Sequence, residues 1–243
     1  MAKLKTRDGV KEHKVVSKKE WVKARKQLLV KEKKFSKARD EIAKQRRALP
    51  WVKIEKEYIF EGPNGKETLA ELFNGKSQLV VYHFMFGPGW GEGCAHCSFW
   101  ADHYDGVTKH IGARDTAFAV ISRAPLKEIK PFKKRMGWQF KWVSLNGNDF
   151  NFDMDVSFTP EQLKNGTAIY NYVPLEMDID EREGASAFYK DSRGDIYRTY
   201  STYARGIDLL NTTYNFIDLT AKGRDENPKR SQEWVRYHDQ YKK

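Results

Sequence analysis

Cysteine is scarce in this sequence, since the 243 residues contain only Cys94 and Cys97. Two cysteines cannot supply the disulfide framework of a small secreted domain, so they are interpreted as a metal pair, a redox pair or two buried thiols. Long hydrophobic runs are also lacking, because no apolar stretch reaches the roughly 18 residues that cross a bilayer. The sequence therefore predicts a soluble, cytoplasmic protein without a membrane partner.

Acidic residues are scarce at the N-terminus. Residues 1–50 contain 18 Lys and Arg against 6 Asp and Glu, a net charge of +12, whereas the remaining residues sum to −1. The lysines surround a helical pattern and lack interleaved aromatic residues, apart from one apolar stripe. Nucleic acid is therefore not an expected partner, and the basic character belongs to an arm rather than to the body.

The arm, residues 1–50, is predicted to contain one long amphipathic helix. Ser17 and Glu20 have the spacing of a capping box, and Trp21, Leu28 and Phe35 belong to a narrow apolar stripe. The pattern stops before Pro50. Because an isolated helix of such charge is marginal in water, we expect a homodimer in which this helix contributes contacts.

The body, residues 51–222, alternates strand and helix patterns, and residues 223–243 form a predicted tail. Apolar runs predict buried strands, a helix follows each of the first two, and a turn joins the last two in a hairpin. The strands are predicted at 79–86, 116–121, 140–144, 187–190 and 196–200, with helices after Cys94, over 125–136 and over 206–216. Residues 146–182 are expected to be an irregular insertion. This order predicts an α/β protein with a thioredoxin-like three-layer α/β/α fold, a mixed central sheet and an N-terminal helical arm.

The two cysteines form a Cys-x-x-Cys motif between a predicted buried strand and a helix. Unpaired N–H groups at the start of the helix favour a negative charge on Cys94 and lower its pKa. Cys97, one helical turn later, lies on the same face and can resolve a mixed disulfide. The alternative is that both are inert residues packed against the sheet.

Five motifs closely resemble a family of thioredoxin-like proteins known as domain-of-unknown-function family 899. They are LVVYHFMFGP at 79–88, CSFWAD at 97–102, SRAPL at 122–126, RMGW at 135–138 and YSTYARG at 200–206. The resemblance implies a bacterial-type cytoplasmic protein with a thioredoxin-like fold, related to thioredoxins and to the peroxiredoxin branch, and no settled activity. Thioredoxins have Trp directly before the motif, whereas Gly93 stands here.

Five further residues are candidates around the motif. His96 can stabilise a thiolate or simply face solvent, and His83 can act as a general base or be a hydrogen-bonded core residue. Trp90 and Trp100 flank the motif and could line a substrate groove, although Trp100 fits the core better. Arg123 is a secondary candidate for the same groove.

The sequence favours a thiol–disulfide oxidoreductase acting on a protein or small-molecule disulfide or thiol, without a cofactor. The alternatives are a non-catalytic binding or dimerisation module and a thiol peroxidase. A structural zinc site would need a second Cys/His pair, which the sequence does not supply, so no metal is expected.

Overall fold

The computed structural model describes residues 13–145, 147–227 and 231–242. The rest of the predicted arm (1–12), insertion (146) and tail (228–230 and 243) lies outside the described residues. The chain divides into two compact units, which are described separately: residues 1–50 with 213–229, and residues 51–212 with 230–243.

The first unit contains the predicted long helix, α1 (Lys18–Arg47). Its capping box is formed: the Glu20 N–H donates to Ser17 Oγ at 3.3 Å, and the Ser17 N–H donates to the Glu20 carboxylate at 3.0 Å. No described side chain of α1 is buried, and Phe35 is 70% exposed. Within the single chain, α1 therefore presents its apolar stripe without a packed partner face.

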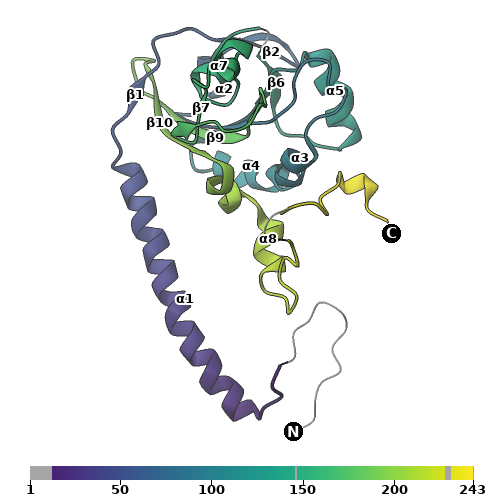
Figure 1. Ribbon diagram of the computed structural model, residues 1–243. Coiled ribbons are helices and arrows are strands. Elements are labelled where there is room, and N and C mark those ends of the chain that lie inside the picture. The colour runs from purple at the N-terminus through teal and green to yellow at the C-terminus, as the bar shows by residue number, and fades with distance from the viewer. Residues whose placement is uncertain (1–12, 146, 228–230, 243) are drawn as a thin grey trace. The chain divides into compact units, whose positions relative to one another are not determined.

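The second unit is built on an eight-stranded mixed sheet in the order β1-β10-β9-β4-β5-β6-β2-β3. β4, β5 and β6 are parallel, whereas β9 runs antiparallel to β4 and forms a hairpin with β10. The strands are β1 (Val52–Lys53), β2 (Ile59–Gly62), β3 (Gly65–Thr68), β4 (Gln78–His83), β5 (Thr116–Ser122), β6 (Trp142–Ser144), β9 (Gly184–Lys190) and β10 (Ile196–Tyr203). This arrangement confirms the predicted thioredoxin-like fold with a mixed central sheet (Figure 1).

Helices and short strands complete the chain. They are α2 (Leu69–Leu72), α3 (Ala95–Ala101), α4 (Tyr104–Gly112), α5 (Leu126–Arg135), α6 (Phe150–Asp153), α7 (Pro160–Lys164), β7 (Ile169–Tyr170), β8 (Val173–Pro174), the 3-10 helices η1 (Ala204–Leu210) and η2 (His238–Gln240), and α8 (Thr212–Ile217). No described helix has the length and apolar character that a membrane span requires.

Alternating side chains of β4 pack on opposite faces of the sheet, as the two-residue period of a strand requires. Val81 belongs to a buried cluster with Phe60 and Phe150. Tyr82 faces the other way, where its ring lies 5.2 Å from that of Tyr104 on α4. Apolar cover on both faces explains why the run from residue 79 reads as continuously hydrophobic.

Three predicted elements differ in the structure. β4 ends at His83, three residues before the apolar run does, because the chain turns away toward α3. The predicted helix at 206–216 is divided into η1 and α8, since Asn211 has an extended backbone and a fully buried side chain. The insertion at 146–182 contains the short elements α6, α7, β7 and β8, which are joined by irregular segments.

Candidate functional site

The local backbone places Cys94 at the N-cap of α3, immediately after the loop that follows β4. The Cys94 N–H donates to the Met85 carbonyl at 3.0 Å, and the Cys94 carbonyl accepts the Ser98 N–H at 3.0 Å. Gly93 is required for close packing, because a Cβ there would lie 2.6 Å from the Phe84 ring. The first cysteine is thus fixed by the end of the central strand and by the first turn of the helix.

The two thiols are free and have different surroundings. Cys94 is partly exposed, whereas Cys97 is 2% exposed and its sulfur accepts the Met85 N–H at 3.5 Å. A hydrogen bond from Cys97 holds the pKa of Cys94 well below its usual range, helped by His96 and by the Cys97 backbone N–H. Burial raises the pKa of Cys97 well above its usual range, and the nearby Cys94 raises it further.

His96 is the basic residue next to this pair. Its interaction with Cys94 is the main cause that raises the pKa of the imidazole. Its Nε2 lies 3.3 Å from the Gln232 carbonyl, and because a carbonyl only accepts, Nε2 carries the hydrogen in this contact. A protonated His96 beside Cys94 stabilises a thiolate.

The C-terminal segment, residues 231–242, contributes site residues that the sequence analysis missed. The Tyr237 hydroxyl donates to the Gly93 carbonyl at 2.6 Å, and the Trp234 ring lies 5.3 Å from that of Phe99. These contacts join positions more than a hundred residues apart, which no local pattern encodes. The aromatic residues of the tail were the available signal, because a solvated tail has little use for them.

His83 lies at the end of β4 and is fully buried. Its Nδ1 is 3.0 Å from Asn151 Oδ1 and its Nε2 is 2.9 Å from Ser186 Oγ. Burial lowers the pKa of His83 to about 4, so the ring is neutral at physiological pH. Both ring nitrogens are therefore engaged with core partners from the insertion and from β9.

The other three candidates occupy separate places. Trp90 is 42% exposed in the loop before Cys94. Trp100 is buried, and its indole N–H donates to the Ile207 carbonyl at 2.9 Å. Arg123 forms ion pairs with Asp180 and with the buried Glu181. The structure therefore brings Cys94, His96 and Cys97 together, and gives Trp100 and Arg123 partners of their own.

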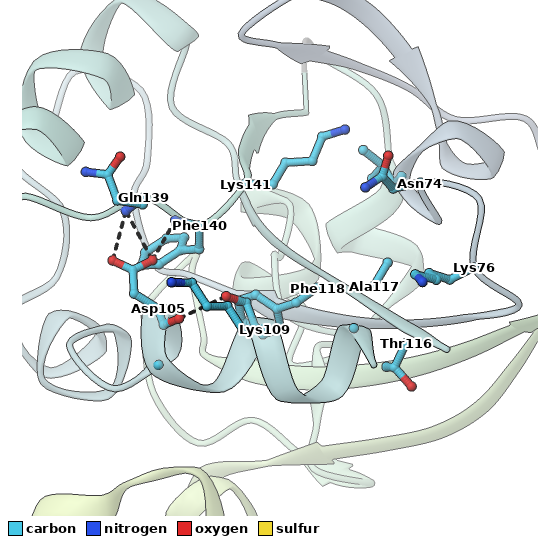
Figure 2. A pocket seen from close by; sticks show the side chains of 14 residues that line it. Asn74, Lys76, Asp105, Lys109, Thr116, Ala117, Phe118, Gln139, Phe140 and Lys141 are labelled. Carbon is cyan, nitrogen blue, oxygen red and sulfur yellow. Dashed lines mark hydrogen bonds between the residues drawn. The ribbon is translucent and has the colours of Figure 1, made fainter. Parts of the chain in front are cut away.

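The molecule has a cavity of about 620 Å³ that is lined by residues of α4, β5 and the segment 139–141. Figure 2 shows that Asp105 accepts hydrogen bonds from the backbone N–H groups of Gln139 and Phe140, and all three residues line the cavity. Its lining includes Thr116, the first residue of β5, so the cavity lies at the opposite end of the strands from the cysteines.

Metal ligands do not gather in the part of the chain that the structure describes, where no three His, Cys, Asp or Glu side chains are placed to share an ion.

Comparison with known proteins gives a family and several distant structural likenesses. The model of the family described as "Bacterial protein of unknown function (DUF899)" matches residues 10–241. No curated protein matches the sequence.

Solved structures similar to the chain include three peroxiredoxins or peroxidoxins. Peroxidoxin BcpB from Mycobacterium tuberculosis is 11% identical, with a TM-score of 0.43, and the match covers 69% of this chain and 96% of that one. Peroxiredoxin Q from Xanthomonas campestris is 13% identical with a TM-score of 0.41, covering 64% and 87%. The yeast mitochondrial 1-Cys peroxiredoxin is 14% identical with a TM-score of 0.39, covering 68% and 75%.

Proposed function

The chain belongs to the bacterial family of unknown function DUF899, and we propose that it is a thiol–disulfide oxidoreductase. In this proposal Cys94 attacks a substrate disulfide and Cys97 resolves the mixed disulfide. The observation that carries it is the placement of the two cysteines: Cys94 is the N-cap of α3 and is partly exposed, whereas Cys97 lies one turn later and is 2% exposed. The same placement lowers the pKa of Cys94 and raises that of Cys97.

The first step uses the sulfur of Cys94, the more exposed of the two cysteines. The Cys94 thiolate attacks one sulfur of a substrate disulfide, a Cys94–substrate S–S bond forms, and the other substrate sulfur leaves as a thiolate that takes up a proton. Because Cys97 and His96 lower the pKa of Cys94, its thiolate forms at a lower pH than that of an ordinary cysteine.

The second step uses the buried sulfur. Cys97 attacks Cys94 Sγ, so that a Cys94–Cys97 S–S bond forms and the Cys94–substrate S–S bond breaks. The released substrate thiolate takes up the proton that Cys97 loses. Burial and the neighbouring Cys94 both raise the pKa of Cys97, and the contribution of a negatively charged Cys94 disappears once Cys94 is part of a mixed disulfide. In sum, the substrate disulfide is reduced by two electrons and the protein dithiol is oxidised, and an external dithiol restores the reduced form.

Equilibration in glutathione redox buffers tests this proposal. We expect the intact protein to lose two hydrogens in a single two-electron transition, with both cysteines protected from alkylation in the oxidised form. Cys94→Ser and Cys97→Ser are the matched controls and cannot form the internal disulfide. If the two cysteines never couple in the intact protein, the proposal is wrong.

The parent protein and its cysteine variants also distinguish the two alternatives that the sequence left open. A thiol peroxidase would consume hydrogen peroxide with a dithiol reductant through Cys94, whether or not Cys97 is present. A non-catalytic module would retain its cellular role when Cys94 is replaced by Ser.

A further inference from the structure

The C-terminal segment contacts α3 and the loop that precedes it at three points. The Gln232 carbonyl lies 3.3 Å from His96 Nε2, the Tyr237 hydroxyl donates to the Gly93 carbonyl at 2.6 Å, and Trp234 packs on Phe99. Gly93 and His96 are the residue before Cys94 and the second residue after it. The segment therefore touches the chain on both sides of the proposed nucleophile.

The segment is also anchored away from the cysteines. Asp239 makes two hydrogen bonds to the Arg135 guanidinium on α5, at 2.7 and 3.1 Å, and His238 Nδ1 lies 2.7 Å from Asp102 Oδ1. Val235 is 2% exposed. The two hydrogen bonds between Asp239 and Arg135 and the burial of Val235 indicate that the segment is packed as part of the folded domain.

Gln232 has a backbone that L-residues seldom adopt, with φ of 67°. Its carbonyl accepts the Val235 N–H at 3.0 Å, so a tight turn fixes the direction of the oxygen that faces His96. A left-handed non-glycine residue persists only where its surroundings hold it, and such residues cluster at functional sites.

We infer that the C-terminal segment is a positioning element of the cysteine site, in which the Gln232 carbonyl orients the His96 ring beside Cys94. The inference rests on the proposed function, because it concerns the reactivity of the same thiol. The carbonyl acts through the imidazole, so Gln232 is a positioning residue and not a catalytic one.

The Gln232 carbonyl acts on Cys94 through the charge of the imidazole. An acceptor on Nε2 favours the protonated imidazole, and the Gln232 carbonyl contributes in this way to the raised pKa of His96. The cation in turn favours the Cys94 thiolate. Three other titratable groups act on His96 or Cys94: Cys97 of α3, Glu183 immediately before β9, and Tyr237. Tyr237 in turn interacts with Glu92 and Arg135.

The test compares two full-length variants at one position. Gln232→Pro cannot adopt a positive φ and must move the carbonyl, whereas Gln232→Gly adopts that φ without strain and keeps it. The measurement is the pH dependence of Cys94 alkylation by iodoacetamide, with the modified residue located by mass spectrometry. Below the pKa of the thiol, we expect Gln232→Pro to slow alkylation by about tenfold, equivalent to one pKa unit, and Gln232→Gly to retain the parent rate.

A His96→Asn background shows whether the effect runs through the imidazole. There Gln232→Pro should cause no further slowing, because the group that it displaces is already gone. Equal slowing with and without His96, or no slowing in the parent background, would overturn the inference. Tyr237→Phe, which removes only the hydroxyl that donates to Gly93, serves if Gln232→Pro does not fold. It should slow alkylation in the parent and not in the His96→Asn background, and any other pattern counts against the segment.

Failure here and failure of the proposed function are distinguishable. Alkylation needs no substrate disulfide and no Cys97 step, so it reports on the segment even if the protein never turns over. Conversely, a protein that exchanges disulfides but whose Cys94 reactivity ignores Gln232 and Tyr237 retains its proposed function and loses this inference.

Discussion

The Met85 N–H donates to the sulfur of Cys97 at 3.5 Å, which ties the buried thiol to the end of the central strand. The Met85 carbonyl in turn accepts the Cys94 N–H at 3.0 Å. One residue of the loop after β4 therefore fixes the backbone of the first cysteine and the side chain of the second. This arrangement holds both sulfurs at one end of the sheet with unequal exposure.

Replacing Cys97 should change the acidity of Cys94. The hydrogen bond from Cys97 is the largest cause of the low pKa of Cys94, so Cys97→Ala should raise that pKa by about one unit or more. Thiolate absorbance in the ultraviolet, recorded over a pH series with Cys94→Ala as the blank, gives the value. An unchanged pKa would mean that His96 and the backbone carry the stabilisation alone.

His83 should make the free energy of unfolding depend on pH in the acidic range. Its pKa of about 4 in the folded protein lies below the ordinary histidine value of 6.5, so the unfolded chain binds more protons between these values. Stability due to His83 is therefore complete above about pH 6.5 and is lost as the pH falls toward 4, by roughly 3 kcal/mol.

The check for His83 is denaturant unfolding of the parent and of His83→Gln across that range. Gln keeps hydrogen-bonding groups without the titration, so the difference between the two proteins should shrink as the pH falls. Parallel curves would show that the ring is not buried in its neutral form.

Glu181 should have the opposite dependence. Burial raises its pKa to about 7 although Arg123 and Ser157 hydrogen-bond to it. The folded state then binds more protons than the unfolded state between pH 4.5 and 7, and stability is lost as the pH rises through 7.

A neutral substitute avoids that loss. As the pH rises from 4.5 to 8, the free energy of unfolding of Glu181→Gln should increase by roughly 3 kcal/mol relative to that of the parent protein, as read from denaturant unfolding. Asp180→Asn, which changes the more exposed partner of Arg123, is the matched control and should show no such gain. A Glu181→Gln protein that is less stable at pH 8 than the parent would indicate that the ion pair outweighs the burial.

The exposed stripe of α1 should control assembly. Trp21, Leu28, Phe35 and Ile42 are spaced by seven residues, the period of a coiled-coil seam, and are 48–70% exposed. The predicted homodimer should become a monomer when Leu28 and Phe35 are both replaced by Gln, whereas Val30→Gln, off the stripe, should leave it intact. Sedimentation equilibrium measures this, and a monomeric parent protein would contradict the prediction.

Local features of the site were predictable and distant ones were not. The Ser17 capping box and the place of Cys94 before a helix depend on residues within one or two turns, so sequence patterns encode them. Asn151, which binds His83, lies in the insertion, and Gln232 is 136 positions from His96. Such contacts depend on how the chain folds back, and a single sequence carries no periodic signal for them.

The division of the predicted helix at 206–216 has a similar origin. Asn211 is followed by Thr212 and Thr213, and Asn and Thr are weaker helix formers than the leucines before them. The side chain of Asn211 is fully buried and its backbone is extended. Burial of this side chain in the folded chain, which local periodicity does not encode, accompanies the break.

The roles of the two cysteines are tested most directly by trapping the first intermediate. The parent protein, Cys94→Ser and Cys97→Ser are each mixed with glutathione disulfide, and the products are identified by intact mass and peptide mapping. We predict an internal disulfide in the parent, a stable mixed disulfide at Cys94 in Cys97→Ser, and no adduct in Cys94→Ser. An adduct at Cys97, or equal labelling of all three proteins, would contradict the account.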